Sequence, residues 1–487
     1  MMKILFASSE AVPFAKTGGL ADVSGALPRA LSQLGHEVTL ILPKYRQVDE
    51  QKHHLNKTGM ILRVPVSQRV ETAEVYAVEQ GPRLRTLFVG QETYYDREQL
   101  YGTPSGDFED NAERFTFFSR AIVEAALELK PDIIHCNDWQ TGLAPVYLQT
   151  LYRHVSALQG VASIFTIHNI GYQGLFWHYD MHLTNLGWEV FTPKGLEFYG
   201  KLNFLKGGIV FADAVTTVSQ KYREEIQTPE YGAGLEGVLR ERQADLYGIL
   251  NGVDYTEWDP AKDLFIKERY HPGDLYGKKI CKRDLQREFG FAEDEEIPLI
   301  GVISRFTDQK GFDLIAEIIE PLMELGIQLV ILGTGEEKYH LLMEEIAMKY
   351  PSQAGIRIAF DNPLAHRIEA GADMFLMPSR YEPCGLNQIY SLKYGTIPIV
   401  RATGGLDDTI EDFNPVTGEG NGFKFQDYSP AEFLATVERA IALFRDRVLW
   451  ERLILRGMAA DFSWEKSAGA YESLYERVLL KKRSASR

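Results

Sequence analysis

The sequence predicts an α/β protein built from two doubly wound domains, because apolar runs and amphipathic stretches alternate along nearly the whole chain. Residues 3–8 form a short apolar run typical of a buried parallel strand, and residues 38–42 form a second one. The amphipathic stretch between them completes a βαβ unit. The composition agrees, since 487 residues with 45% hydrophobic and 25% charged side chains are enough for two or three globular domains.

The same alternation occurs in two separate series. In the first, a helix at 111–129 precedes strands at 132–135, 162–167 and 214–218, and the turn Asn251-Gly252 closes the series. The second series places strands at 298–303, 328–332, 356–359, 373–377 and 397–400. We therefore expect one domain at 1–250 and another at 251–463. Ligands of such sheets bind beyond the carboxyl ends of the strands, so two facing domains would form one cleft.

Several classes of protein are disfavoured by composition. The opening apolar run is too short for a signal peptide and no run of 18 apolar residues occurs, which predicts a cytoplasmic protein without a membrane partner. Cys136, Cys281 and Cys384 lie far apart, which disfavours disulfides and a zinc site. The net charge of −16 disfavours nucleic acid, so an anionic ligand needs a local basic cluster. The basic tail at 481–487 is expected to be disordered.

The first candidate site is the string Lys16-Thr17-Gly18-Gly19-Leu20-Ala21-Asp22-Val23, between the first strand and its helix. Lys16 supplies a cation, Gly18 and Gly19 let the backbone approach a ligand, and the helix start offers unpaired N–H groups to a phosphate. Glycines at such a turn serve packing equally often. The spacing fits neither the dinucleotide fingerprint nor the P-loop, so a nicotinamide enzyme and a P-loop NTPase are disfavoured.

Two further groups follow strands of the second series. Arg305 and Lys310 stand before a helix, where two cations suit a diphosphate, although a solvated loop is the alternative. The string Ser379-Arg380-Tyr381-Glu382-Pro383-Cys384-Gly385-Leu386 holds the carboxylate of Glu382 at a strand end. A carboxylate at that place is suited to bind sugar hydroxyls or to stabilise a developing positive charge. The alternative is that it caps the following helix. No Asp-x-Asp occurs, so a metal-bridged diphosphate is not expected.

These two strings resemble the bacterial glycogen synthase and plant starch synthase family, and the resemblance covers nearly the whole chain. It implies the GT-B fold of two Rossmann-like domains facing across a cleft, with a last helix at 464–480 that packs back onto the N-terminal domain. It also implies retaining transfer of glucose from ADP-glucose to the non-reducing 4-OH of an α-1,4-glucan, with glycogen as product. ADP-glucose is then a co-substrate, and no cofactor or metal is expected.

The resemblance also assigns roles to residues. Glu382, His168 and Asp138 are the implied catalytic residues, while His135 is interpreted as structural. Asn251 belongs first of all to an interdomain turn, and the resemblance implies that it also contacts the donor sugar. Thr403-Gly404-Gly405 after the last strand are implied donor contacts as well, although a plain turn explains them nearly as well. The implied donor-binding set is Lys16, Gly18, Gly19, Asn251, Arg305, Lys310, Phe360, Cys384, Gly385, Leu386, Thr403, Gly404 and Gly405.

Two positions depart from patterns in related enzymes. Phe360 stands where many bacterial relatives have Tyr, so it can stack on adenine but lacks the hydroxyl. Tyr390 stands where many other retaining GT-B enzymes carry a second Glu, which fits the glycogen synthase branch. A UDP-glucose-dependent glucosyltransferase, a nucleotide-sugar epimerase and a catalytically silent glycan-binding protein remain the alternatives. The glycan-binding protein is disfavoured because the cations expected to bind phosphate, Lys16, Arg305 and Lys310, are all present.

Overall fold

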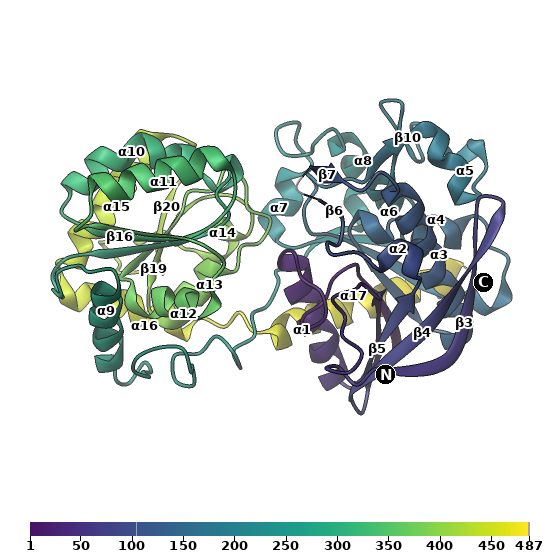
Figure 1. Ribbon diagram of the computed structural model, residues 1–487, viewed down its shortest axis with the longest axis horizontal. Helices are drawn as coiled ribbons and strands as arrows, with labels where there is room; N and C mark the ends of the chain where they lie inside the picture. The colour runs from purple at the N-terminus through teal and green to yellow at the C-terminus, as the bar shows by residue number, and fades with distance from the viewer. Residues whose placement is uncertain (104, 486–487) are drawn as a thin grey trace. The chain divides into compact units, whose positions relative to one another are not determined.

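The computed structural model describes residues 1–103 and 105–485, and it divides into two compact units (Figure 1). Unit 1 comprises Met1–Val218, Arg223–Gly252 and the last helix, α17 (Trp464–Ala485), and unit 2 comprises Ser219–Tyr222 and Val253–Ser463. Each unit is a mainly parallel sheet covered by helices. The predicted α/β class with two doubly wound domains is confirmed.

Unit 1 is built on a nine-stranded sheet whose central strands are almost completely buried, as strands covered on both faces must be. Across the sheet, in order, lie β14 (Leu246–Gly248), β13 (Ala214–Thr217), β9 (Ala162–Ile167), β8 (Ile133–Asn137), β1 (Lys3–Ala7), β2 (Glu37–Pro43), β5 (Leu84–Gly90), β4 (Arg69–Gly81) and β3 (Asn56–Val66). The sheet is parallel from β14 to β5, and β4 and β3 add an antiparallel hairpin.

Helices and two small sheets complete unit 1. The helices are α1 (Gly19–Gln33), α2 (Glu92–Tyr95), α3 (Asn111–Leu129), α4 (Leu143–Gln149), α5 (Met181–Thr184), α6 (Phe204–Phe211) and α8 (Glu236–Glu241), with α7 (Gln220–Glu225) at the boundary between the units. Short 3₁₀ helices are η1 (Trp139–Thr141), η2 (Ser156–Leu158), η3 (His178–Asp180), η4 (Trp188–Val190) and η5 (Gln243–Asp245). The small antiparallel sheets are β10 (Leu175–Trp177), β12 (Lys201–Asn203) and β11 (Glu197–Phe198), and the pair β6 (Gly102–Thr103) and β7 (Gly106–Asp107).

Helix α17 packs against α1 and β9 of unit 1, although it is separated from them by hundreds of residues in sequence. Tyr475 bonds to Nδ1 of the buried His135 at 2.6 Å, and Glu472 pairs with Nε2 of His36 at 2.9 Å. The expectation of a disordered tail is wrong for residues 481–485, which continue the helix. Lys482 pairs there with Asp213 at 2.8 Å, so the basic side chains neutralise carboxylates of unit 1. Residues 486–487 lie outside the described residues.

Unit 2 is a six-stranded parallel sheet with helices on both faces (Figure 1). Its strands in spatial order are β17 (Ala354–Ile358), β16 (Gln328–Gly333), β15 (Leu299–Ile303), β18 (Met374–Met377), β19 (Ile397–Arg401) and β20 (Phe423–Phe425). Figure 1 shows α10 (Phe312–Glu324), α11 (Glu337–Lys349) and α15 (Pro430–Phe444) on one face, and α9 (Tyr276–Glu288), α12 (Asn362–Gly371), α13 (Asn387–Tyr394) and α16 (Arg447–Ala459) on the other. Two short helices, η6 (Asp308–Lys310) and α14 (Gly404–Thr409), follow β15 and β19.

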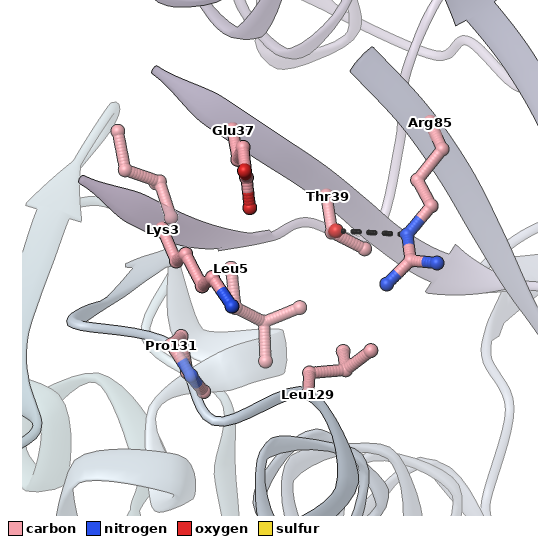
Figure 2. Close-up of a pocket in the computed structure, with 8 residues that line it drawn as sticks. Lys3, Leu5, Glu37, Thr39, Arg85, Leu129 and Pro131 are labelled. Atoms are coloured by element: carbon pink, nitrogen blue, oxygen red, sulfur yellow. Dashed lines mark hydrogen bonds between the residues drawn. The ribbon is translucent and has the colours of Figure 1, made fainter. Parts of the chain in front are cut away.

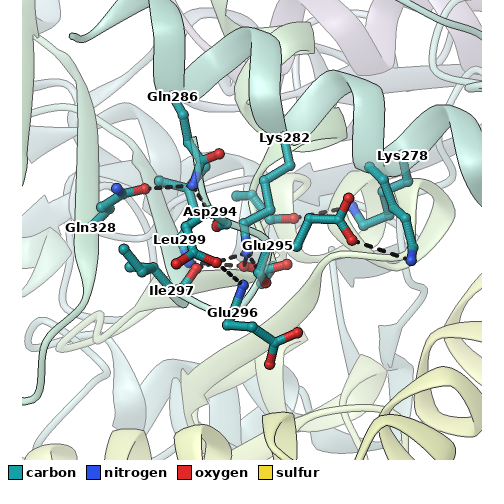
Figure 3. A network of polar contacts seen from close by, with 12 residues as sticks. Lys278, Lys282, Gln286, Asp294, Glu295, Glu296, Ile297, Leu299 and Gln328 are labelled. Atoms are coloured by element: carbon teal, nitrogen blue, oxygen red, sulfur yellow. Dashed lines mark hydrogen bonds and ion pairs between the residues drawn. The ribbon is translucent and has the colours of Figure 1, made fainter. Parts of the chain in front are cut away.

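A buried polar network fixes α9 to the amino ends of the strands of unit 2 (Figure 3). The Nζ of Lys282 donates to the carbonyls of Glu295 and Ile297 at 2.9 and 2.7 Å and pairs with Asp373 at 2.7 Å. Gln286 in turn donates to Gln328 at 2.8 Å. Because a buried ammonium must be fully satisfied, these bonds fix the position of α9. The network lies at the edge opposite to the carboxyl ends, so it serves the fold of the unit.

Candidate active site

The strand order of unit 2 reverses between β15 and β18, and predicted donor residues follow both strands. Such a reversal is where doubly wound sheets bind ligands. Glu382, in the loop after β18, accepts hydrogen bonds from Lys310 Nζ at 2.5 Å and from Ser379 Oγ at 3.0 Å. The Glu382 side chain is only 7% exposed and that of Lys310 18%. The structure therefore joins the predicted phosphate cation and the predicted sugar carboxylate into one largely desolvated ion pair.

Glycines shape the backbone around this pair. Gly404 has a φ of +45°, and a Cβ there would lie 1.9 Å from the carbonyl oxygen of Glu382. The N–H of Gly405 donates to the same carbonyl at 3.1 Å, so this amide is engaged within the unit. Thr403 and Cys384 are buried beside this contact. By contrast, among the described residues no partner receives the N–H groups of Gly385 and Leu386, which stand just before α13 and remain open to an anion.

Arg305 and Phe360 lie on the surface of unit 2. Arg305 is exposed in the loop that follows β15, on the same side of the sheet as Lys310. Phe360 is 85% exposed and immediately precedes Asp361, the residue that caps α12. A ring this exposed contributes little to the core, which leaves it available to a planar ligand. Tyr390 is engaged elsewhere, because its ring stacks on Trp258 at a centroid distance of 3.9 Å.

In unit 1 the strand order reverses between β1 and β8, and the Lys16 loop follows β1. Lys16 pairs with Asp22 in the first turn of α1 at 2.6 Å, and both side chains are substantially exposed. A Cβ at Gly18 or Gly19 would meet nothing within 4 Å, so the space beside the loop is open. The cation predicted to hold a phosphate is therefore held by one solvent-exposed carboxylate.

Sequence analysis did not identify Glu10, whose carboxylate organises this loop. Glu10 is 4% exposed and accepts hydrogen bonds from the N–H and Oγ1 of Thr17, from the N–H of Gly18 at 3.2 Å and from the Tyr101 hydroxyl at 2.7 Å. A carboxylate with this many donors is strongly positioned. The sequence signal that could have identified Glu10 is its position shortly after the first strand. Polar side chains that follow parallel strands gather at one edge of the sheet.

The second group in unit 1 follows β8 and β9. Asp138 adopts a φ of +55°, which is rare for a residue other than glycine. Its carboxylate accepts the N–H of His168 at 2.8 Å, and burial, reinforced by the charge of Glu10, raises its pKa to about 7. Nε2 of His168 bonds to Asn137 at 2.9 Å, and burial lowers the pKa of His168 to about 3. The structure thus brings together Asp138 and His168, two of the three residues that the resemblance makes catalytic, and the imidazole of His168 is neutral.

Two other predicted residues of unit 1 occupy the interior. His135 bonds through both ring nitrogens, to Tyr475 and Thr166 at 2.6 Å each, which confirms the structural interpretation. Asn251 is buried, and its Oδ1 has no partner among the described residues. An orphaned buried acceptor is costly and indicates a ligand or water partner. The neighbouring Gly252 packs against α17, since a Cβ there would lie 2.6 Å from the Cα of Trp464.

A cavity of about 90 Å³ lies elsewhere in unit 1 (Figure 2). It is lined near the amino ends of β1, β2 and β5 by Lys3, Glu37 and Thr39, with Arg85 donating to Thr39 at 3.1 Å. It contains none of the predicted site residues. Among residues 1–103 and 105–485, no cluster of three His, Cys, Asp or Glu side chains is arranged to hold a metal ion, and no helix is long and apolar enough to cross a membrane.

Two Rossmann-like units with polar residues at their strand reversals are typical of GT-B glycosyltransferases, and the match to a starch synthase structure places this chain in that class. Residues 3–241 match the family model of the starch synthase catalytic domain, and residues 284–448 match that of glycosyl transferases group 1. The chain is 52% identical to a glycogen synthase of Koribacter versatilis over 98% of both chains. It is 49% identical to a glycogen synthase of an Anaeromyxobacter species, over 98% of this chain and 99% of the relative.

A solved structure agrees over the same length. The catalytic domain of starch synthase IV from Arabidopsis thaliana, bound to ADP and acarbose, superimposes with a TM-score of 0.90 at 34% identity, covering 98% of this chain and 99% of that one. The chain belongs to the glycogen and starch synthase family, and it is a glycosyltransferase. The predicted GT-B fold and the predicted enzyme class are confirmed.

Proposed function

We propose that this enzyme transfers glucose from ADP-glucose to the non-reducing 4-OH of an α-1,4-glucan with retention of configuration, and that it makes glycogen. The observation that carries the proposal is the desolvated Lys310–Glu382 pair beside the open N–H groups of Gly385 and Leu386, at the strand reversal of unit 2. That set offers a cation and amides to a diphosphate and a carboxylate to the attached sugar. The glycogen synthase relatives and the neighbour bound to ADP and acarbose support this choice of substrates.

The chemistry is bond exchange at the anomeric carbon. The bond from C1 to the diphosphate oxygen breaks, the bond from C1 to the acceptor O4 forms on the same face, and the proton of the 4-OH passes to the departing diphosphate. Negative charge grows on the leaving oxygen, so Lys16, Arg305 and Lys310 stabilise the transition state more than the bound donor. Glu382 stabilises the positive charge that develops on the sugar.

Asp138 and His168 supply the acceptor side of the reaction. His168 stays neutral at pH 7, because its pKa is lowered to about 3, so it acts on a sugar hydroxyl as a hydrogen-bond partner without carrying charge. Asp138 holds the backbone of His168 in place through its 2.8 Å hydrogen bond. We place Asp138 beside the same sugar hydroxyl. A carboxyl group with a pKa of about 7 can accept a hydrogen bond from that hydroxyl near neutrality.

We further propose that the reaction needs neither a cofactor nor a metal ion, because three side-chain cations and the loop amides supply the charge that balances the diphosphate. ADP-glucose is consumed as a co-substrate. We assign the enzyme to the cytoplasm, which suits three buried cysteines that form no disulfide.

A donor panel tests the proposal. The purified enzyme is given ADP-glucose or UDP-glucose with glycogen, with and without EDTA, and the anomer of the new linkage is identified by NMR. We expect ADP-glucose to be the better donor, an α-linked product and full activity in EDTA. Faster transfer from UDP-glucose would favour the alternative donor, and turnover of the nucleotide sugar without any acceptor would favour an epimerase.

A further inference from the structure

Three aromatic rings of unit 2 form a parallel stack, and the proposed reaction uses none of them. The indole of Trp258 lies between the imidazole of His366 and the phenol ring of Tyr390. Its centroid is 3.8 Å from that of His366 and 3.9 Å from that of Tyr390, and the interplanar angles are 9° and 8°. We call these three residues the ring stack. Parallel rings at such distances are in van der Waals contact, so the indole fills the space between its two neighbours.

Hydrogen bonds fix the imidazole at one end of the ring stack. His366 is fully buried, and its Nδ1 donates to the carboxylate of Asp263 at 2.7 Å. The hydroxyl of Tyr394 donates to the same carboxylate at 2.5 Å. Asp263 and Trp258 belong to the segment that precedes α9, and Tyr270 of this segment donates to the carbonyl of Tyr394 at 2.7 Å. The segment is therefore anchored at several points, which holds Trp258 in place.

The ring stack joins two helices that begin next to predicted donor contacts. His366 is the fifth residue of α12 and Tyr390 is the fourth residue of α13, so each ring lies about one turn from the start of its helix. Phe360 stands just before the cap of α12, and the open N–H groups of Gly385 and Leu386 stand just before α13. The two helices also pack against each other. The spacing of the three rings therefore sets the spacing between the two groups of contacts.

The distance between the two groups of contacts is comparable with the length of a nucleoside diphosphate. Phe360 comes after β17 and Gly385 after β18, and the order β17-β16-β15-β18 places three inter-strand intervals between them. At about 4.8 Å for each interval, the carboxyl ends of β17 and β18 lie roughly 14 Å apart. One ADP molecule can stack its base on Phe360 and bind the two amides with its phosphates only if this separation is kept.

We propose that Trp258 is a positioning residue of the donor site, which sets the separation between the base contact and the phosphate contact by holding His366 and Tyr390 apart, and this inference rests on the proposed function. In this role Trp258 contacts neither the donor nor the acceptor. Two weak contacts joined in one ligand reinforce each other most when their separation matches the ligand. Without the indole the surroundings relax into part of the empty space, so α12 and α13 shift and ADP no longer makes both contacts at once.

The test compares a ligand that spans the donor site with a ligand that fills only one end of it. ADP spans both contacts, whereas inorganic pyrophosphate fills only the phosphate end. In Trp258→Ala we expect the Kd for ADP and the KM for ADP-glucose to rise roughly tenfold or more, while the Kd for pyrophosphate stays within about twofold. At saturating donor, kcat should change little. Trp258→Phe keeps a flat ring between His366 and Tyr390, so it should restore most of the affinity for ADP.

A double-mutant cycle shows whether Trp258 acts through Phe360. Phe360→Ala removes the base contact directly, so it should weaken ADP binding and leave pyrophosphate binding unchanged. Once the base contact is gone, a further Trp258→Ala should change the Kd for ADP by less than about twofold. Fully additive effects of the two substitutions would refute the inference, because Trp258 would then act by another route.

Loss of stability is controlled with Phe433→Ala. Phe433 is fully buried on α15, on the face of the sheet opposite to α12 and α13, and its ring lies 5.3 Å from that of Phe425 (Figure 1). Its removal should destabilise unit 2 as the loss of Trp258 does, but leave the Kd for ADP unchanged. Equal losses of ADP affinity in both variants would show that Trp258 only supports the fold. Should Trp258→Ala not fold, Trp258→Leu, which fills space without a flat ring, replaces it in the same assays.

The outcomes separate this inference from the proposed function. If the unsubstituted enzyme binds neither ADP nor ADP-glucose, the proposed function fails. If it binds ADP and Trp258→Ala binds ADP equally well, only the role of Trp258 is refuted. The same holds if Trp258→Ala loses affinity for ADP and for pyrophosphate alike, because the effect would then not depend on the separation of the two contacts.

Discussion

Removing the carboxylate of Glu382 should separate catalysis from nucleotide binding. Glu382 is bonded to Lys310 at 2.5 Å and to Ser379 at 3.0 Å, and its side chain is 7% exposed. In Glu382→Ala the developing positive charge on the sugar loses its counter-charge, which typically costs about 10²-fold in kcat. Lys310 loses its partner at the same time, so its ammonium becomes available to the diphosphate. We therefore expect ADP to bind at least as tightly as in the unsubstituted enzyme.

The assay pairs two measurements on the same preparation. ADP affinity is measured by isothermal titration calorimetry, and kcat is measured with ADP-glucose and maltotriose. Glu382→Gln is the matched control for shape, because its amide oxygen can still accept from Ser379 Oγ while the charge is gone. Lys310→Ala is the control for charge, and it should weaken ADP binding and lower kcat together.

The stability of the variant must be followed as well. Breaking one partner of a buried pair costs about 3–5 kcal/mol when the remaining charge stays buried. Lys310 is 18% exposed and can turn to water, so the loss should fall below that range. A folded Glu382→Ala enzyme with near-normal turnover would remove Glu382 from the catalytic residues. Parallel loss of ADP affinity and turnover would instead make it a donor-binding residue only.

Three further predictions follow from the same contacts. Lys16→Ala and Arg305→Ala should each lower kcat/KM by roughly 10²-fold with full activity retained in EDTA, and activity that returns only with Mg²⁺ would contradict the metal-free step. Burial raises the pKa of Asp138 to about 7 and so favours its protonated form. The free-energy cost of burying the ionised carboxylate is therefore absent at low pH and grows as the pH rises towards 7. Asp138→Asn should therefore raise the melting temperature more at pH 8 than at pH 5, and an equal shift at both would show that the carboxyl titrates normally. Gly252→Ala should destabilise the protein by roughly 1–3 kcal/mol in chemical denaturation, because the new Cβ would lie 2.6 Å from the Trp464 backbone. Gly469→Ala on α17 is the control: a Cβ there meets nothing within 4 Å, so this substitution should stabilise the protein by about 0.5–1 kcal/mol.

Most of the parallel strands of both units could be predicted because burial on both faces leaves continuous apolar runs, but the parallel strands β5 and β14 were not named. All ten strands named from the sequence are present, with ends within two residues of the predicted ones. The hairpin β3 and β4 was missed, since Gly59 and Pro65 interrupt β3 and are typical of loops. β20 has three residues, too few to show a period. Edge strands depend on their neighbours for stability, and neighbours are not visible along one chain.

Candidate site residues could be named from the sequence one by one, but their hydrogen-bond partners could not. Lys16, Lys310 and Glu382 were identified because a charge at the end of a buried strand faces a ligand edge. That Lys310 binds Glu382 across 72 residues follows only from the order of β15 and β18 in the sheet. The same reasoning explains Glu10, whose hydrogen bonds to Thr17 and Gly18 depend on how the loop folds back over the end of β1.

The pairing of Lys16 and Lys310 with carboxylates would keep the proposed phosphate site of this acidic chain ready for a ligand. Lys16 and Lys310 are each neutralised by a carboxylate, but the two pairs differ in burial. The pair of Lys16 with Asp22 is 43% and 33% exposed, and an exposed pair contributes about 0–1 kcal/mol, so a diphosphate can replace Asp22 at little cost. The Lys310 pair is 18% and 7% exposed, and separating it would leave a desolvated charge. Lys310 should therefore keep Glu382 when the donor binds and reach the phosphate with its remaining N–H groups, which would hold the carboxylate next to the sugar on which positive charge develops.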